Sequence, residues 1–497
     1  MRLGTVLYIL GWFLLFFAIA LLVPAGIAFF YHEPLAPFLA SAAISTSAGL
    51  ALLFLLRPEK EIGYREGFAV VVFSWTAAGV FGALPFVFAG YLGFVDALFE
   101  SISGFTTTGS TVFSSLEHLT KSIHFWRAFS QWLGGMGIIV LSLAILPLLG
   151  IGGMQLYQAE MPGLTKDKLA PRIQDTARIL WGVYIFFTLF EVLLLLAGGL
   201  DWYEAFCHAF TTLATGGFST RTASIAAFGN AYVDYVIVFF MFMAGVNFTL
   251  HYRFLKGDFG AYFRSEEFRF YFGVGLLGLL ICLIFNYGRV YQDPLENLRY
   301  SLFQVWSIMT TTGYGTADFD LWHPVCRLLL LNLMFFGGMA GSTGGGIKQV
   351  RLLIFFKFIG FQFRKLIHPK AVEIVRYDGA KVPNEIVQAV LGYMALYALV
   401  FMAASLLVTA QGIDLITATS AVAATLNNIG PGLEGVGPTK NFGWLPSFSK
   451  LVLTFCMLAG RLELYTVAIL FTKSYWRGLR LPVWRVRQAS GRRASFR

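Results

Sequence analysis

The chain has 497 residues, of which 57% are hydrophobic and only 13% are charged, with a formal net charge of +10. Soluble globular domains carry about 25% charged residues, so this chain lacks the polar residues that a water-facing surface needs. The composition excludes a soluble protein and a disordered chain, and it favours a polytopic membrane protein.

Ten apolar stretches are long enough to cross a bilayer as helices, because about 20 apolar residues span roughly 30 Å of hydrocarbon. They lie near residues 5–30, 35–56, 66–90, 125–149, 178–199, 232–254, 270–287, 326–360, 384–409 and 448–472. The first stretch is too long for the core of a signal peptide and is predicted to remain as a span. The eighth is unusually long and has a glycine-rich interruption.

Basic residues gather in alternate connecting segments. If the N-terminus is cytoplasmic, the inner segments carry most of the Lys and Arg residues, and the outer segments carry few. This asymmetry predicts that both termini are cytoplasmic. It indicates attraction of the inner face to anionic lipid or, alternatively, a docking surface for a cytosolic partner. Nucleic acid is not expected as a partner, because the basic residues do not cluster on a soluble domain.

Four outer segments share one pattern, in which a short amphipathic stretch ends in a Thr/Gly-rich turn. The stretches and turns are VDALFESISGF with TTTGST, DWYEAFCHAFTTL with ATGGFST, LENLRYSLFQVWSIM with TTTGYGT, and DLITATSAVAATL with NNIGPGL. The turn glycines Gly109, Gly216, Gly313 and Gly430 recur roughly every 100 residues. Four copies of span, short helix, turn and span predict a pseudo-fourfold arrangement around one axis.

The physics of these turns indicates a cation pore. A short helix cannot cross the bilayer, so the chain must turn back inside it, where non-helical backbone survives only if protein or water covers it. Glycine allows backbone angles that point successive carbonyls at one axis, and such carbonyls can replace the hydration shell of a cation. The negative C-terminal ends of the short helices also favour a cation. The alternative is that the turns only cap helices at a water interface.

Acidic residues precede each turn. We expect them to cap or solvate the short helices and secondarily to concentrate cations at the pore mouth. These residues are Asp96, Glu100, Asp201, Glu204, Asp293, Glu296 and Asp414.

Two features inside the apolar stretches carry further hypotheses. Residues 337–346 are too rich in glycine to form a stable helix, since each glycine costs about 1 kcal/mol in a helix interior. Gly341 to Lys348 is superficially similar to a phosphate-binding loop, but Gln349 replaces the Ser/Thr that would meet magnesium. Arg461 lies inside the last span, and a charge at that depth indicates a functional site unless it pairs locally with Glu463.

The sequence resembles the TrkH/KtrB superfamily of potassium transporters over nearly its whole length. The resemblance rests on the four turns, on GGMAGSTGGGIKQVR at residues 337–351 and on GRLELYT at residues 460–466. It implies an all-α polytopic membrane protein with two N-terminal helices and four membrane–pore-loop–membrane repeats in pseudo-fourfold arrangement around a central pore. The first two spans are similar to an extra N-terminal pair that the KtrB branch lacks.

This organisation predicts six segments. They are an N-terminal helix pair (1–60), pore repeats 1 (61–165), 2 (166–262), 3 (263–375, with an intramembrane loop at 337–347) and 4 (376–476), and a basic cytoplasmic tail (477–497).

The resemblance also implies the site residues. The potassium selectivity filter would be the backbone of Thr107, Thr108, Gly109, Ala214, Thr215, Gly216, Thr311, Thr312, Gly313, Asn428, Ile429 and Gly430. The gate would comprise Gly338, Gly341, Ser342, Thr343, Gly344, Gly345, Gly346, Lys348 and Arg461. Only the glycine is common to all four filter segments, so we expect fewer regular ion sites than in a homotetrameric filter. Gly109 at the first filter position is similar to the potassium-selective members.

The expected function is potassium uptake across a bacterial inner membrane, with K⁺ as the transported ion and no catalytic cofactor. The resemblance implies a homodimer and a cytosolic nucleotide-binding regulatory subunit of the TrkA type, and the chain is not expected to be an enzyme.

Two alternatives remain. A proton- or sodium-coupled symporter would need an intramembrane carboxylate, for which Glu191 and Glu463 are the candidates. A membrane enzyme would use the glycine loop for phosphate. The sequence leaves open the coupling ion, the gating stimulus and the preference among potassium, rubidium and ammonium.

Overall fold

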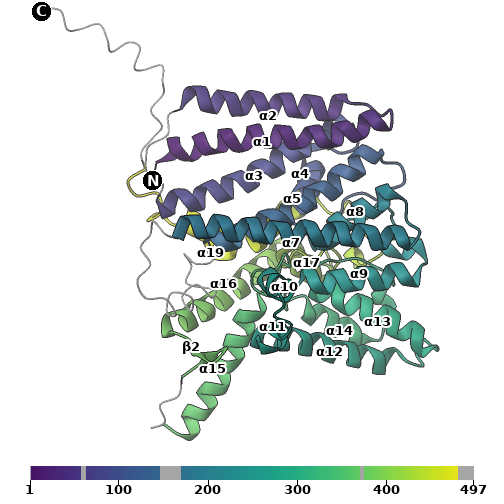
Figure 1. Cartoon of the computed structure of the whole chain (residues 1–497), viewed down its shortest axis with the longest axis vertical. Helices are drawn as coiled ribbons and strands as arrows, with labels where there is room; N and C mark the ends of the chain where they lie inside the picture. Colours follow the sequence, from purple (N-terminus) through teal and green to yellow (C-terminus); the bar gives the residue numbers. More distant parts are fainter. Residues whose placement is uncertain (1, 57–62, 146–168, 370–373, 480–497) are drawn as a thin grey trace, which may run out of the picture.

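The structure is a computed structural model that describes residues 2–56, 63–145, 169–369 and 374–479, and in these ranges it is mostly helical (Figure 1). The N-terminal pair is α1 (Leu3–Phe30) and α2 (Ala36–Leu55). The first repeat comprises α3 (Tyr64–Phe88), α4 (Phe94–Phe105) and α5 (Lys121–Ile145). The second comprises α7 (Leu169–Ala197), α8 (Trp202–Leu213), α9 (Ala231–Ala244), α10 (Phe248–Leu255) and α11 (Ala261–Arg264).

The other two repeats follow the same order. The third comprises α12 (Glu266–Asn286), α13 (Pro294–Met309), α14 (Pro324–Leu333) and α15 (Gln349–Ile367). A short antiparallel hairpin of β1 (Arg376–Tyr377) and β2 (Ala380–Lys381) precedes the fourth, which comprises α16 (Asn384–Thr409), α17 (Leu415–Leu426), α18 (Ser447–Arg461) and α19 (Leu464–Ala468). The predicted basic tail lies outside the described residues from residue 480 onward.

The helices agree with the predicted spans. Among the described residues, six helices are long and apolar enough to cross a membrane, and two bent pairs could each form one more span. The remaining two predicted spans correspond to α5 and to the interrupted pair α14 and α15. The predicted all-α polytopic fold class is confirmed.

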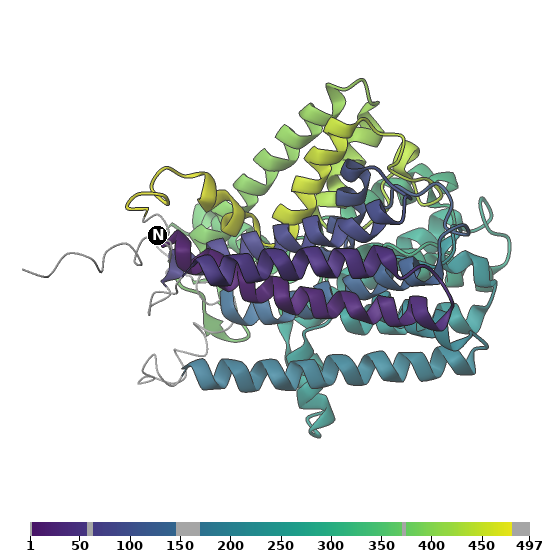
Figure 2. The same cartoon turned by 90° about the horizontal axis from the view of Figure 1, so that it is seen from above.

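Two predicted spans are not straight. The helix axis turns by 103° between α9 and α10 and by 115° between α18 and α19. At the second break Glu463 has a φ of 66°, in the left-handed region that is uncommon for residues with side chains. The α9–α10 turn carries α10 out of the common helix direction (Figures 1 and 2).

The repeats are joined in a ring by their packing. The second span of each repeat packs against the short helix of the next: α5 against α8, α9 against α13, and α18 against α4. Between the third and fourth repeats, α14 and α17 share one buried apolar cluster. The helix pair α1 and α2 lies outside this ring and packs against α3 (Figure 1).

The short helices begin as the sequence predicts. Asp201, Asp293 and Asp414 are N-caps of α8, α13 and α17, and each carboxylate accepts a backbone N–H of the first turn. Such a cap is worth about 1 kcal/mol because it satisfies an otherwise unpaired donor. In α4 the cap is Gly93, and Asp96 instead contacts Lys450.

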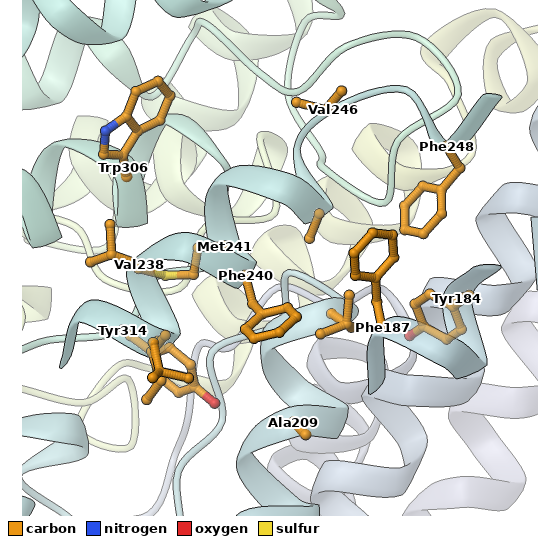
Figure 3. Close-up of a cluster of buried hydrophobic side chains, with 14 of the residues drawn as sticks. Tyr184, Phe187, Ala209, Val238, Phe240, Met241, Val246, Phe248, Trp306 and Tyr314 are labelled. Atoms are coloured by element: carbon orange, nitrogen blue, oxygen red, sulfur yellow. The ribbon is translucent and has the colours of Figure 1, made fainter. Parts of the chain in front are cut away.

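Apolar side chains fill the spaces between repeats. Figure 3 shows one cluster, in which Tyr184 of α7 lies beside Phe248 of α10 and Phe187 of α7 lies beside Phe240 of α9; the same cluster contains Tyr314 from the third repeat. Many large apolar side chains of α1, α7 and α12 are exposed. In a membrane protein these side chains face lipid, and association of the helices depends on close packing.

Candidate functional site

The four short helices end in the same backbone conformation. The residue after each C-cap has a left-handed φ: 53° at Thr107, 54° at Thr215, 64° at Thr311 and 57° at Asn428. The N–H of the next residue then reaches back five residues to a helix carbonyl. These bonds run from Thr108 to Ser103 (2.8 Å), Gly216 to Thr211 (2.8 Å), Thr312 to Ser307 (2.9 Å) and Ile429 to Ala424 (2.9 Å). This is the Schellman arrangement, repeated four times.

A second left-handed residue follows two positions later, and it is glycine in every repeat. It is Gly109 (φ 84°), Gly217 (φ 75°), Gly313 (φ 81°) and Gly430 (φ 100°). We call the segments Thr107–Gly109, Thr215–Gly217, Thr311–Gly313 and Asn428–Gly430 the glycine turns.

The second turn differs from the predicted register by one residue. The predicted filter segment there is Ala214 to Gly216, but Ala214 is the C-cap of α8 and corresponds to Thr106, Thr310 and Asn427. Two glycines are adjacent in the motif ATGG, and the sequence alone does not distinguish them. The backbone does, because only Gly217 has the left-handed φ.

The glycine turns close into a ring. A Cβ atom added to each glycine would collide with, or press against, a carbonyl oxygen of the following repeat. The pairs are Gly109 with Gly216 O, Gly217 with Thr312 O, Gly313 with Ile429 O, and Gly430 with Thr108 O. The order 1, 2, 3, 4 and back to 1 is the predicted pseudo-fourfold arrangement, and it requires a residue without a side chain at each junction.

Side chains brace this ring. Ser110 donates to the carbonyl of Gly430 (2.9 Å), and the Asn428 amide donates to the hydroxyl of Thr108 (2.9 Å), so both join repeats 4 and 1. Gln131 on α5 donates to the carbonyl of Gly216 (2.7 Å) and accepts the N–H of Phe218 (3.1 Å). Asn428 departs from the Thr pattern of the other turns, and its longer amide reaches across the junction.

A buried ion pair lies next to the ring. Arg127 on α5 pairs with Glu100 on α4 at 2.8 Å, and it also donates to the carbonyl of Ser219 (3.0 Å) in the second repeat. The carboxylate of Glu100 accepts the N–H of Val112 (3.0 Å) as well. Glu100 is fully buried, so the expectation that it solvates a helix or attracts cations at the mouth is wrong.

Arg127 and Gln131 were not among the predicted site residues. They are four residues apart on an apolar helix, so they share one face. Two polar side chains at that spacing inside an apolar segment are the signal that identifies them.

A non-helical segment, which we call the glycine loop (residues 334–348), separates α14 from α15. Its two limbs approach backbone to backbone: the N–H of Gly337 bonds the carbonyl of Ile347 (3.1 Å), and a Cβ on Gly344 would lie 3.0 Å from the Cα of Gly338. The glycines are therefore required by close packing within the loop. The sequence alone indicates only that these residues are too rich in glycine to form a stable helix.

The glycine loop contacts the glycine turns directly. The hydroxyl of Thr215 donates to the carbonyl of Thr343 (3.0 Å), and the N–H of Gly345 donates to the hydroxyl of Thr311 (2.6 Å). A Cβ on Gly345 would also collide with the carbonyl of Asn427 and would lie 3.0 Å from the Cβ of Asn428. The structure thus brings the predicted gate residues against three of the four predicted filter segments.

Two buried cations hold the loop. Arg461, which is 3% exposed at the end of α18, donates to the carbonyls of Thr343 (2.8 Å) and, more weakly, Gly134 (3.4 Å). Lys348 donates to the carbonyl of Gly344. Within the described part of the chain Arg461 makes no ion pair, because Glu463 pairs with Arg351 (2.6 Å) instead.

The two candidate coupling carboxylates differ. Glu463 is neutralised by Arg351, which also lies over the ring of Tyr393 at 4.0 Å. Glu191 on α7 is fully buried, and among the described residues it makes no ion pair and has the side chain of Thr212 as a polar neighbour.

Almost the whole chain is similar to known proteins of one family. The model of the family described as "TrkH: Cation transport protein" matches residues 35–477. The Trk system potassium uptake protein TrkH of Escherichia coli (strain K12) is 41% identical over 484 residues, covering 96% of this chain and all of that protein. The Trk system potassium uptake protein TrkG of the same strain is 35% identical over 480 residues, covering 95% of this chain and 98% of that protein.

A solved structure has the same fold. The crystal structure of the potassium transporter TrkH from Vibrio parahaemolyticus aligns with a TM-score of 0.89 at 39% identity, covering 96% of this chain and all of the other.

Proposed function

Because this chain belongs to the TrkH family of cation transport proteins, we propose that it takes up potassium ions across the membrane through one pore at the axis of its four repeats. Its relatives at 41% and 35% identity are named potassium uptake proteins. The observation that carries the proposal is the closed ring of glycine turns, in which each glycine adjoins a carbonyl oxygen of the next repeat.

The ring has the chemistry that a potassium filter needs. Backbone carbonyls that face the axis replace the water around a monovalent cation. The C-terminal ends of α4, α8, α13 and α17 lead directly into the turns, and their partial negative charges favour a cation there. We propose that the filter is the backbone of Thr107–Gly109, Thr215–Gly217, Thr311–Gly313 and Asn428–Gly430.

The four turns are unlike, and this bears on selectivity. The carbonyl of Gly216 accepts a hydrogen bond from Gln131, so it offers less electron density to a cation than an unbonded carbonyl does. We therefore expect fewer equivalent ion sites than in a filter of four identical strands, and weaker discrimination of potassium from its neighbours.

The glycine loop is the proposed gate. Its bonds to Thr215 and Thr311 support a position at the end of the filter where the short helices finish. Arg461 adds a buried positive charge at the loop, which raises the barrier to a cation at low dielectric. Opening would require the glycine loop to lose its hydrogen bonds to Thr215, Thr311 and Arg461 at the same time.

The decisive experiment is flux into liposomes that contain only this protein. We expect uptake of rubidium, used as a potassium tracer, and weaker uptake of sodium. Gly313→Ala should abolish the uptake, because its new methyl group would collide with the carbonyl of Ile429. Gly273→Ala on α12 is the matched control, since a Cβ there meets nothing within 4 Å. Rubidium uptake no greater than in empty liposomes would contradict the proposal, as would full activity of Gly313→Ala.

A coupled symporter is the second candidate, and Glu191 is the observation that favours it. Glu191 is fully buried and makes no ion pair among the described residues, so it is the carboxyl that we propose as the proton carrier. Uptake of protons together with rubidium, lost in Glu191→Gln, would establish coupling. Rubidium uptake with no proton movement would contradict proton coupling and would favour a channel mechanism.

The remaining features are proposed on the same basis. The distribution of basic residues supports a multi-pass protein of the bacterial inner membrane with both termini in the cytoplasm. Val6 of α1, Ala69 of α3 and Tyr475 pack in one cluster, which supports a common side for the two ends. The relatives are named as parts of a Trk system, which supports a TrkA-like nucleotide-binding subunit as the cytosolic partner. We also propose a homodimer as the assembly. The function proposed is transport, with no enzymatic reaction.

A further inference from the structure

One buried carboxylate at the start of α12 joins three separate elements. Glu267 is 3% exposed. One of its oxygens accepts the backbone N–H groups of Ala340 (2.8 Å) and Val350 (3.1 Å). The other accepts the hydroxyl of Tyr377 at a longer distance of 3.4 Å. None of these partners is on α12 itself.

Each partner belongs to an element with a distinct role. Ala340 lies in the glycine loop, Val350 lies in the first turn of α15, and Tyr377 lies on the strand β1. The first N–H groups of a helix have no partner within the helix and carry partial positive charge, so a carboxylate at Val350 is doubly favourable. Lys348, the buried cation that holds the loop, also interacts electrostatically with Glu267.

Residues at the surface hold the hairpin of β1 and β2 next to the carboxylate of Glu267. Asp378 accepts the backbone N–H of Glu266 (2.8 Å), and Lys357 of α15 donates to the carbonyl of Arg376 (2.8 Å). Lys357 also pairs with the side chain of Glu266. Figure 1 shows β2 beside α15 at one end of the bundle. The hairpin therefore links an exposed surface to the buried carboxylate that contacts the glycine loop.

We propose that Glu267 is a positioning residue that holds the glycine loop closed, and that the hairpin of residues 376–381 covers and orients it. The inference rests on the proposed gate function of the loop and deepens it. Arg461 holds the loop at Thr343, whereas Glu267 holds it at Ala340, on the limb nearer α14. Release of either contact favours the open loop, and release of Glu267 also frees the start of α15.

The test compares graded changes at one position. Glu267→Ala removes both acceptor oxygens and leaves the N–H groups of Ala340 and Val350 without this partner. Glu267→Gln keeps an acceptor oxygen and loses the charge. A hydrogen bond to a charged group shifts an equilibrium by about tenfold or more, so basal rubidium flux without any partner should rise about tenfold in Glu267→Ala and less in Glu267→Gln. Glu385→Ala, an exposed glutamate in the first turn of α16, is the matched control and should leave flux unchanged.

A second readout separates positioning from stability. Ser342 in the glycine loop is fully buried, so a cysteine introduced there should react slowly with a water-soluble thiol reagent. The reaction should become faster in the presence of Glu267→Ala, while the preference for rubidium over sodium stays as in the wild type. A purely structural role would lower yield and change selectivity without raising flux.

Tyr377→Phe provides an independent route if Glu267→Ala does not fold, because it removes only the hydroxyl on β1. It should raise basal flux by a smaller factor than Glu267→Ala. Unchanged flux and unchanged Ser342→Cys reactivity in the folded variants would overturn the inference. Absence of rubidium flux in the wild-type protein would instead contradict the proposed function, so the two failures are distinguishable.

Discussion

At the scale of single residues, the glycine turns combine strain with bonding. Three threonines and one asparagine adopt the left-handed conformation, which is uncommon for residues with side chains and especially for β-branched ones. The hydroxyls of Thr215 and Thr311 each form a hydrogen bond with the backbone of the glycine loop. The hydroxyl of Thr107 is buried with no partner among the described residues. Hydrogen bonds to the glycine loop therefore offset the cost of the left-handed backbone in repeats 2 and 3, but not in repeat 1.

Gly109→Ser tests the ring at one junction. Its φ of 84° disfavours a side chain, and the added Cβ would collide with the carbonyl of Gly216. We expect normal expression with a loss of discrimination between potassium and sodium, read as stronger inhibition of rubidium uptake by sodium. Gly182→Ser on α7 is the control, because nothing lies within 4 Å of its added Cβ. Wild-type selectivity in Gly109→Ser would remove this residue from the filter.

Arg461 has no carboxylate partner within the described ranges, so its removal exposes no buried negative charge. Arg461→Ala should remain folded and should raise basal rubidium flux about tenfold, because a charge-assisted bond to the loop is lost together with the positive charge. Arg461→Lys should keep the charge and most of the barrier, while losing the forked bonding to two carbonyls. A marked fall in melting temperature of Arg461→Ala without a rise in flux would assign Arg461 a structural role instead.

At the scale of elements, two second spans, α9–α10 and α18–α19, are broken next to the glycine loop, and the two breaks supply partners for it. The break after α9 leaves the carbonyls of Ala244 and Gly245 free to accept the N–H groups of Thr343 (3.3 Å) and Met339 (2.9 Å). The break after α18 places Arg461 beside the loop. Inside a membrane an unpaired backbone group is costly. Here the backbone groups left unpaired by the helix breaks form hydrogen bonds with the glycine loop.

Glu117 joins the loop after α4 in repeat 1 to the loop after α8 in repeat 2. Its carboxylate accepts the N–H (3.0 Å) and the hydroxyl (2.5 Å) of Thr222. The hydroxyl bond is the main reason that the pKa of Glu117 falls from its ordinary 4.5 to about 2. A depressed carboxyl pKa contributes stability that is present above pH 4.5 and is lost as the pH falls towards about 2.

Glu117→Gln should therefore melt at a lower temperature than the wild type at pH 6, and the difference should shrink between pH 4.5 and about 2. Thermal unfolding in detergent across this range measures it. The exposed Glu385→Gln serves as the control and should show no such convergence. A melting difference for Glu117→Gln that is independent of pH would contradict the role of the ionised carboxylate.

At the scale of the whole molecule, the fold is a ring of four repeats with an additional helix pair at its edge. All four cysteines are buried, so introduced cysteines can report which side of the membrane a loop faces. His118 lies in the loop between α4 and α5, Lys256 follows α10, and both are exposed.

A membrane-impermeant thiol reagent should label His118→Cys from outside intact cells. It should label Lys256→Cys only after the cells are opened. The unmodified protein should label weakly in both cases. Labelling of both variants from the same side would contradict the proposed topology.

The sequence by itself determined the features that depend on local physics. Span lengths follow from runs of apolar residues, and the starts of α8, α13 and α17 follow from Asp201, Asp293 and Asp414, because a cap acts within its own first turn. The fourfold repeat was visible because each copy needs the same helix end, and glycine is the residue that allows it.

Tertiary structure alone decided which groups meet. The register of the second turn depends on whether Gly216 or Gly217 adopts the left-handed conformation beside the third repeat, and neighbouring residues do not specify this. The same holds for Glu463, which pairs with Arg351 of another repeat and leaves Arg461 for the glycine loop. Inside a membrane every buried charge and backbone group must find a partner, and for these groups the partner comes from a distant part of the chain.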